Sequence, residues 1–241
     1  MRILSSDCLL TALTRVHVLE LVPQKRICLE IGVNRGAFSQ AILNKAAPRV
    51  LHLMDPWPTD QSDEYLSTYH VNSDMEENYQ SVLGIFNQQI LSGQVVVHRG
   101  YSKDCLGEFG DASLDFIYVD AMHSYEACLA DLVSYSVKLK STGILMGHDF
   151  SNTVVGRRKQ FGIVRAVHDF LRCSDFMPVM VTIENAPSYV LTRHHATRDA
   201  LITGALEKGP GTLVEFSRML EMQQIAVPLK SRKRPVELMR L

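Results

Sequence analysis

The chain has 241 residues, of which 46% are apolar and 21% are charged. This length is enough for one α/β domain with a full core, and the composition excludes disorder, collagen-like structure and coiled coil. The 25 basic residues nearly balance the 26 acidic ones, leaving a net charge of −1. Such a balance gives no electrostatic case for nucleic acid or an anionic membrane as a partner, so any ligand must be recognised by a local site.

The five cysteines lie far apart and form no Cys-x-x-Cys pair. This spacing excludes a zinc ribbon and a thioredoxin motif, and it indicates a reducing compartment. Apolar residues recur at helical spacing from Leu9 to Leu19, while Asp7 and Arg15 interrupt what would be the core of a signal peptide. No apolar run approaches the roughly 18 residues that a membrane-spanning helix needs. We therefore predict a short amphipathic lead-in helix within residues 1–25 of a cytoplasmic protein.

Strand-like and helix-like segments alternate along the middle of the chain. The continuous apolar segments are typical of strands in a parallel sheet that is buried on both faces. They are residues 26–32, 49–55, 94–100, 113–120 and 143–150. Two further strand-like segments, 177–183 and 188–193, are separated by only four residues and predict a terminal antiparallel hairpin. The pattern predicts a Rossmann-like, doubly wound α/β sheet with helices on both faces.

Two segments fall outside this alternation. Residues 58–75 are polar and aromatic, and they are too long for a plain loop between a strand and a helix. We interpret them as an insertion that forms a lid or substrate loop, with a tolerated surface loop as the alternative. Residues 196–241 are expected to form a C-terminal helical extension with a basic tail. A solvated or oligomer-contacting tail is favoured over a nucleic-acid-binding arm.

The turn after the first predicted strand contains Glu30, Gly32, Asn34 and Gly36. Gly32 permits a sharp turn and a close approach to a ligand, and Gly36 opens a helix whose N-terminal amides face that ligand. Asn34 stands where a dinucleotide-binding motif has its second glycine, which counts against NAD and FAD. A carboxylate at Glu30 would repel a pyrophosphate and suits a ligand that carries positive charge.

The second and third predicted strands also end in polar residues. Asp55 ends the second strand, where an acid can accept hydrogen bonds from two ribose hydroxyls. The alternative is an Asp that caps the turn before Pro56. Gly100 and Ser102 follow the third strand and could border an adenine.

Four polar side chains follow the fourth and fifth predicted strands: Asp120 and His123 after one, and His148 and Asp149 after the other. If the two strands are neighbours, about 5 Å apart, these side chains converge on the edge where open α/β sheets bind ligands. Two carboxylates and two imidazoles can hold one divalent ion, or supply a general base beside an acidic residue that orients it. Taken singly, Asp120 could be a helix cap and His148 a packed core histidine.

The segments CLEIGVNRGAFS, LMDPW, VDAMHSYEACLADL and GILMGHDF together resemble class I S-adenosylmethionine-dependent methyltransferases. More narrowly, they are similar to the macrocin-type sugar O-methyltransferases, and more distantly to the catechol-type enzymes. The resemblance implies a methyltransferase domain over residues 26–195. It also implies a seven-stranded sheet in the order 3-2-1-4-5-7-6 with strand seven antiparallel.

The resemblance further implies which residues bind S-adenosylmethionine. Glu30 would lie near the methionine ammonium, Ser39 near its carboxylate and Asp55 at the ribose. The full set of implied cofactor-binding residues is Glu30, Gly32, Asn34, Gly36, Ser39, Asp55, Ser102 and Asp120.

For the reaction itself, the resemblance implies His123 as the catalytic base, together with Asp120. Asp120 and Asp149, with His148 beside them, would be the ligands of a divalent metal such as Mg²⁺. Metal-dependent relatives carry two adjacent acidic or amide residues where this chain has His148 and Asp149, and Mg²⁺ prefers oxygen to imidazole. Metal assistance is therefore left open.

We predict a methyltransferase that transfers the methyl group of S-adenosylmethionine to a hydroxyl of a small acceptor, without nucleic acid or membrane as a partner. One alternative is a nicotinamide-dependent oxidoreductase, but its glycine-rich pyrophosphate loop is absent. Another is a non-catalytic binding subunit with the same fold, which would be expected to lack the polar residues at the strand ends. The identity of the acceptor and the oligomeric state, including a homo-oligomer, are left open.

Overall fold

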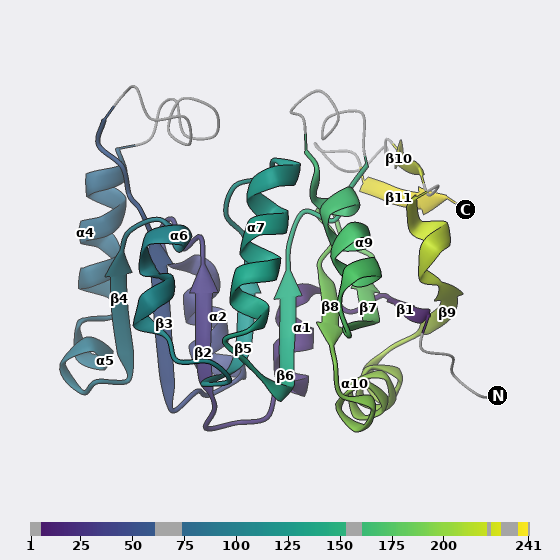
Figure 1. The fold of residues 1–241 in the computed structure, drawn as a ribbon, viewed down its shortest axis with the longest axis horizontal. Helices are drawn as coiled ribbons and strands as arrows, with labels where there is room; N and C mark the ends of the chain where they lie inside the picture. Colours follow the sequence, from purple (N-terminus) through teal and green to yellow (C-terminus); the bar gives the residue numbers. More distant parts are fainter. Residues whose placement is uncertain (1–5, 61–73, 153–160, 221–222, 228–235, 241) are drawn as a thin grey trace.

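The computed structural model describes residues 6–60, 74–152, 161–220, 223–227 and 236–240. Within these residues nine strands form one sheet: β1 (Asp7–Thr11), β2 (Ile27–Ile31), β3 (Val50–Asp55), β4 (Val95–Arg99), β5 (Leu114–Val119), β6 (Leu139–Gly147), β7 (Met177–Thr182), β8 (Tyr189–Thr192) and β9 (Gly211–Glu215). The strands lie in the order β4-β3-β2-β5-β6-β8-β7-β1-β9, as Figure 1 shows. This is the predicted α/β architecture, built on a mostly parallel sheet.

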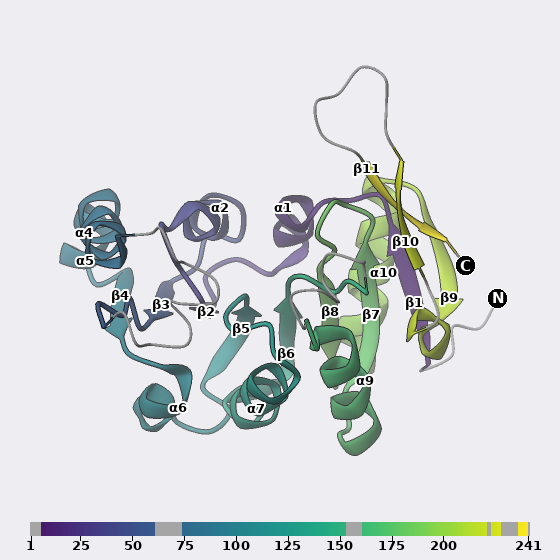
Figure 2. The same cartoon turned by 90° about the horizontal axis from the view of Figure 1, so that it is seen from above.

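Helices cover both faces of the sheet (Figure 2). One face carries α6 (Ser102–Cys105), α7 (Tyr125–Ser136) and α9 (Ile163–Cys173), and the other carries α1 (Arg15–Val18), α2 (Ala37–Lys45), α4 (Met75–Ile85), α5 (Asn87–Leu91) and α10 (His195–Lys208). Three short 3-10 turns are η1 (Leu19–Leu21), η2 (Leu106–Glu108) and η3 (Phe216–Leu220). Each face of the sheet therefore buries its own apolar core, as expected for strands made of continuous apolar residues.

The register of the parallel strands brings their C-terminal ends to one edge of the sheet. Ile31 at the end of β2 pairs with Met54 of β3 and with Val119 of β5. Val119 in turn pairs with Gly147 at the end of β6. The loops that follow these four strands, which carry most of the predicted site residues, therefore start from the same level.

The sheet has nine strands, so the prediction of seven strands was wrong and the full order differs from the predicted one. The run β4-β3-β2-β5-β6-β8-β7 lies within it and corresponds to the expected 3-2-1-4-5-7-6. The last of the expected strands, β8, is antiparallel to both β6 and β7, as the short hairpin predicted. The two additional strands are β1, which is parallel to β7, and β9, which is antiparallel to β1.

The predicted N-terminal helix from Leu9 to Leu19 was also wrong, because Asp7–Thr11 is a strand. Only Arg15–Val18 and the turn at Leu19–Leu21 are helical in this part of the chain. The apolar residues fit the spacing of a helix and also that of a strand. The strand forms because the edge of β7 offers backbone hydrogen-bond partners. Side chains of β1 then fill the cores on both faces of the sheet.

The C-terminal extension is helical only in part. The helix α10 begins at His195 and ends at Lys208, and the chain then returns to the sheet as β9. The unpaired edge of β1 accounts for this, because it gives β9 the backbone partners that a further helix would not use. Beyond η3, β10 (Gln223–Val227) and β11 (Val236–Arg240) form a separate antiparallel pair.

Two predicted segments lie largely or wholly outside the described residues. These are the proposed lid over residues 58–75, of which 61–73 are not described, and the basic stretch within residues 228–235. Among the helices of the described part, none combines the length and the apolar character needed to cross a membrane.

The placement of β1 can be tested with Leu9, whose side chain is fully buried in the core. Leu9→Ala should lower the free energy of unfolding by about 2–5 kcal/mol, because it leaves a cavity between packed elements. Leu91→Ala is the matched control, since Leu91 is 75% exposed, and should change stability by less than about 0.5 kcal/mol. Urea unfolding measures both. Equal, small effects of the two substitutions would argue that β1 does not belong to the sheet.

Candidate active site

The turn after β2 passes unusually close to the chain that follows β5. Gly32 has φ +92°, and a Cβ atom at this position would lie 1.9 Å from the carbonyl oxygen of Asp120. A side chain is therefore excluded both by the backbone conformation and by the space available. Gly36, with φ +76°, precedes α2 and packs against the ring of Phe86. The two glycines thus let the turn lie against the neighbouring strand end.

Asp55 holds this turn in place. Its Oδ2 accepts hydrogen bonds from the backbone amides of Val33 (3.0 Å) and Asn34 (2.9 Å), and its Oδ1 accepts one from Trp57 (2.9 Å). Burial raises the pKa of Asp55, while the three amides favour the charged form. A carboxylate has about four acceptor positions, so one is left for a ribose hydroxyl. The structure gives Asp55 a role in shaping the turn, and its ribose contact stays a prediction.

A second set of contacts ties the turn to α4. Asn78, on α4, donates from Nδ2 to Oδ1 of Asn34 at 2.9 Å, and its own Oδ1 accepts a hydrogen bond from Nε of Arg35 at 2.8 Å. The indole of Trp57 donates to the backbone oxygen of Asn34 at 2.8 Å. Asn34 is therefore used to fix the turn, and no other residue type offers both its short amide and its tolerance of φ +50°.

Glu30 and Ser39 are brought together beneath the turn, where Glu30 points towards α2. The Ser39 hydroxyl donates to Oε2 of Glu30, and the Glu30 side chain is almost fully buried. Burial raises the pKa of Glu30 to about 8, and the hydrogen bond from Ser39 offsets only part of this rise. The carboxyl group thus carries a proton at neutral pH in this state. The predicted contacts of the pair with the methionine moiety remain predictions.

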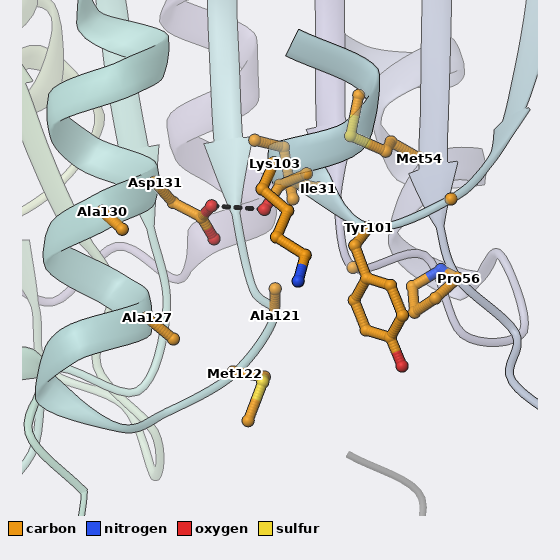
Figure 3. Close-up of a pocket in the computed structure, with 13 residues that line it drawn as sticks. Ile31, Met54, Pro56, Tyr101, Lys103, Ala121, Met122, Ala127, Ala130 and Asp131 are labelled. Carbon is orange, nitrogen blue, oxygen red and sulfur yellow. Dashed lines mark hydrogen bonds between the residues drawn. The ribbon is translucent and has the colours of Figure 1, made fainter. Parts of the chain in front are cut away.

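A cavity of about 360 Å³ opens between the ends of β2, β3, β4 and β5 and the first turns of α7 (Figure 3). Its lining is mostly apolar, with a few polar side chains: Ile31, Gly32, Met54, Pro56, Gly100, Tyr101, Ser102, Lys103, Ala121, Met122, Ala127, Ala130 and Asp131. Of the predicted cofactor-binding residues, Gly32 and Ser102 line this cavity. Asn34, Gly36 and Asp55 shape the turn beside it, Glu30 and Ser39 pair beneath that turn, and Asp120 lies next to Gly32. The cavity lies where ligands bind in open α/β sheets.

Asp131 is a buried acid in this cavity to which the sequence analysis gave no role. Its Oδ1 accepts a hydrogen bond from the Ser102 hydroxyl, and Tyr135 donates to the backbone oxygen of Ser102 at 2.7 Å. Burial raises the pKa of Asp131 to about 6, against the effect of the Ser102 hydrogen bond. The signal was available, because Asp131 shares the buried face of its helix with Cys128 and Tyr135. An acid on an apolar helix face needs a partner or a ligand.

Beside the cavity, Asp120, His123, His148 and Asp149 converge as predicted from the adjacent ends of β5 and β6; we call these four residues the rim. His123 Nε2 lies 2.7 Å from Asp149 Oδ2 and 3.8 Å from Asp120 Oδ1. His148 Nδ1 lies 3.3 Å from Asp149 Oδ2 and 3.5 Å from Asp120 Oδ2. Met122, which lines the cavity, is the direct neighbour of His123. The rim therefore adjoins the cavity.

In the rim, the two carboxylates stabilise the charged form of His123, and the two histidines stabilise the ionised form of Asp149. Burial of the His123 imidazole disfavours its charged form, but Asp120 and Asp149 outweigh this effect and raise the pKa of His123 to about 9. For Asp149, burial favours the neutral acid, yet the two histidines hold its pKa below the usual range. His123 also stacks on the ring of Phe161, with the ring centroids 4.5 Å apart. The imidazole is thus held in one orientation by a carboxylate and an aromatic ring.

Arg15 enters the rim from α1 and was missed by the sequence analysis. Its Nη1 donates to the Tyr118 hydroxyl at 2.9 Å and lies 3.4 Å from Asp120 Oδ2. Its guanidinium carbon lies 4.8 Å from the ring centroid of Phe38. No sequence signal could have found it, because Arg15 and Asp120 are 105 positions apart.

The fit of the rim to Mg²⁺ can be judged from its donors. Among the described residues, Asp120, His123 and Asp149 each offer a ligand atom, and these atoms lie within 4.8 Å of one another. One ion could span that distance. The set nevertheless includes an imidazole where Mg²⁺ prefers oxygen, and Asp120 already faces the guanidinium of Arg15. The residues present therefore do not fit Mg²⁺ as arranged.

A comparison with known protein families identifies the family to which the chain belongs. The profile of a methyltransferase domain family matches residues 29–150, about half of the chain. A comparison with curated protein sequences gives no match.

Solved structures show the same fold at low sequence identity. The chain is similar to an N-methyltransferase, NodS, from Bradyrhizobium japonicum (12% identity, TM-score 0.52, 73% of this chain and 91% of that one). It is similar to a tRNA methyltransferase, TrmK, from Bacillus subtilis (15% identity, TM-score 0.50, 78% and 68%). A third similar structure is a Streptococcus mutans protein in complex with S-adenosylhomocysteine (10% identity, TM-score 0.51, 73% and 93%).

The buried carboxyl of Glu30 generates a prediction about stability and pH. Burial raises the pKa of Glu30 to about 8 in the folded protein, from the ordinary pKa of 4.5 that applies in the unfolded chain. The contribution of Glu30 to the free energy of unfolding should therefore fall by about 1.4 kcal/mol per pH unit as the pH rises between these two values. Glu30→Gln removes this loss, so its stability relative to the wild type should grow with pH.

Urea unfolding across that pH range measures the effect. Glu207→Gln is the control, because Glu207 is exposed on α10. A difference between Glu30→Gln and the wild type that stays constant with pH would mean that Glu30 is not protonated in the folded state.

Proposed function

The chain belongs to the methyltransferase domain family and has the fold of class I S-adenosylmethionine-dependent methyltransferases, and from this premise we propose that it methylates a hydroxyl group of a small acceptor. The family match sets aside the nicotinamide-dependent oxidoreductase. The observation that carries the proposal is the pair formed by His123 Nε2 and Asp149 Oδ2, 2.7 Å apart beside the cavity. A hydroxyl must lose a proton on methylation, and this pair is placed to take it.

In this proposal the cavity receives the adenosine part of the cofactor. Asp131 accepts a hydrogen bond from the adenine amino group with the oxygen that is not bound to Ser102. Pro56 and the ring of Tyr101 supply apolar surface, and they face the cavity in Figure 3. Gly32 lets the backbone approach the methionine part, and the amides at the start of α2 favour its carboxylate.

When bound, S-adenosylmethionine supplies an activated methyl group on a positively charged sulfur. The residues of the chain have to orient the acceptor oxygen towards that methyl group, remove a proton and exclude water. The bond from the acceptor oxygen to the methyl carbon would form as the bond from that carbon to sulfur breaks, which would leave S-adenosylhomocysteine, and the acceptor proton would pass to the His123–Asp149 pair. The stacking of His123 on Phe161 restricts the imidazole ring to the orientation that the transfer needs.

The proposal also names a branch of the O-methyltransferases and a class of acceptor. The motifs around Asp120 and Asp149 favour the macrocin-type branch of sugar O-methyltransferases. The near-neutral chain, with its net charge of −1, favours a small-molecule acceptor over nucleic acid or a membrane surface, in a cytoplasmic setting. A divalent metal is the alternative source of activation for the acceptor hydroxyl, and chelation separates it from the histidine mechanism.

The adenosine placement predicts that Asp131 contributes to cofactor affinity. Asp131→Asn keeps the shape of the side chain but leaves one accepting oxygen, which cannot serve both the Ser102 hydroxyl and the adenine amino group. Affinity for S-adenosylhomocysteine should fall by about 1–3 kcal/mol, measured by calorimetric titration. Asp111→Asn is the control, because Asp111 pairs with Lys138 on the exposed surface. An unchanged dissociation constant for a folded Asp131→Asn would place the adenine elsewhere.

The reaction itself is tested with His123→Gln. Turnover should fall by about 10²–10⁴-fold, while affinity for S-adenosylhomocysteine stays within a factor of a few. Wild-type turnover should rise with pH up to about 9, because the imidazole accepts a proton only after losing its own. His195→Gln, on the exposed start of α10, is the control.

Turnover is followed with simple hydroxylated acceptors, with and without chelator. Full activity of His123→Gln would contradict the histidine mechanism. Loss of wild-type activity on chelation, restored by Mg²⁺ or Mn²⁺, would replace it with the metal-assisted alternative. Methylation of amines but not of hydroxyls would contradict the proposed acceptor class.

A further inference from the structure

The guanidinium of Arg15 lies beside Asp120, one of the three residues of the rim whose ligand atoms are close enough together to hold one metal ion. Arg15 Nη1 is 3.4 Å from Asp120 Oδ2, and the same oxygen lies 3.5 Å from His148 Nδ1. We propose that Arg15 is the built-in cation of the rim, which compensates the charge of Asp120 and keeps divalent metal ions out. This inference rests on the proposed function, because it takes the rim to be the place where the acceptor is activated.

Arg15 is held by contacts that reach both its backbone and its side chain. Its amide nitrogen donates to Glu184 Oε1 at 2.7 Å, and the same oxygen accepts from the Thr182 hydroxyl at 2.7 Å. Its Nη1 donates to the hydroxyl of the buried Tyr118 at 2.9 Å, and its guanidinium lies over Phe38. The position of the charge is therefore set by the fold and does not depend on a flexible surface side chain.

A permanent charge at this distance opposes a metal ion. Arginine does not lose its proton in proteins, so the positive charge persists at any working pH. An ion bound to Asp120 Oδ2 at about 2.0–2.6 Å would lie no more than about 6 Å from Nη1. Like charges at this separation in a half-buried site disfavour each other. An ion could bind only after the guanidinium had left its place between Tyr118 and Asp120.

The N-terminal segment supplies this charge, and it lies outside the residues that match the family profile. The match covers residues 29–150, whereas β1 and α1 precede it. The strand β1 pairs with β7, and the amide of Ile183 donates to the backbone oxygen of Thr11 at 2.8 Å. The helix α1, which follows β1 and lies beside α2 (Figure 2), brings Arg15 within reach of Tyr118 and Asp120 at the end of β5. The additional strand thus has a consequence for the rim, because it delivers Arg15 to Asp120.

The test measures binding of Mn²⁺ alone by electron paramagnetic resonance, in the full chain. Wild type, Arg15→Met, Asp149→Asn and the double variant are compared. Arg15→Met keeps a long unbranched apolar side chain next to Phe38 and removes the charge. Arg165→Met is the matched control, because Arg165 also lies over a ring, that of Tyr125, and beside an aspartate, Asp169, on the exposed side of α9.

The wild type is expected to show no Mn²⁺ binding that depends on Asp149. Arg15→Met should bind Mn²⁺ at least tenfold more tightly than the wild type, and the double variant should lose this gain. A role of Arg15 in packing alone would not create a metal site. Arg15→Gln, which keeps a hydrogen-bond donor for Tyr118, serves the same purpose if the methionine variant does not fold.

Two results would overturn the inference. One is Mn²⁺ binding to the wild type that disappears in Asp149→Asn, since the metal would then occupy the rim with Arg15 in place. The other is a folded Arg15 variant that gains no Mn²⁺ binding, since Arg15 would then not be what keeps the ion out. Titration with S-adenosylhomocysteine is run in parallel, and its failure would contradict the proposed function without bearing on the metal result.

Discussion

The carboxylate of Asp55 is the contact on which the arrangement of the candidate site depends. It binds three backbone amides of the turns that follow β2 and β3, and so it fixes the path of the chain between the two strand ends. Buried amides without an acceptor are costly, so Asp55 stabilises the turn that Gly32 allows to lie against Asp120. The close approach of these two segments in turn sets where the cavity ends and where the rim begins.

Around that fixed turn, the structure separates two kinds of environment. The cavity is lined mostly by apolar side chains, and its buried acid, Asp131, has a raised pKa. The rim, a few residues away, brings two carboxylates together with two imidazoles, and the guanidinium of Arg15 lies beside it. Because opposite charges lie next to each other there, the carboxylates need no external cation to coexist. A mostly apolar binding pocket beside a charge-balanced reactive edge suits a reaction in which a proton leaves the acceptor.

The N-terminal segment, which lies outside the residues that match the family, contributes Arg15 to the surroundings of the rim. The strand β1 adds to β7 on the far side of the sheet from the cavity, and β9 then covers the edge that β1 would expose. Covering an edge protects it from pairing with other chains. The same addition places α1 beside α2 and carries Arg15 to the end of β5. The extension of the sheet and the charge of the rim are therefore two results of one strand pairing.

Local apolar patterns predicted the alternation of strands and helices, and the rule that parallel strands end at a common edge predicted where a ligand site would lie. The convergence of Asp120, His123, His148 and Asp149 was predicted on the condition that their two strands are neighbours, which the pairing of β5 with β6 confirms. Tertiary structure alone decided that residues 7–11 form a strand, because its apolar run suits a helix as well and only the edge of β7 selects between them. It also decided the neighbours of Asp120, since Arg15 is 105 positions away and its approach depends on a strand pairing that local sequence does not encode.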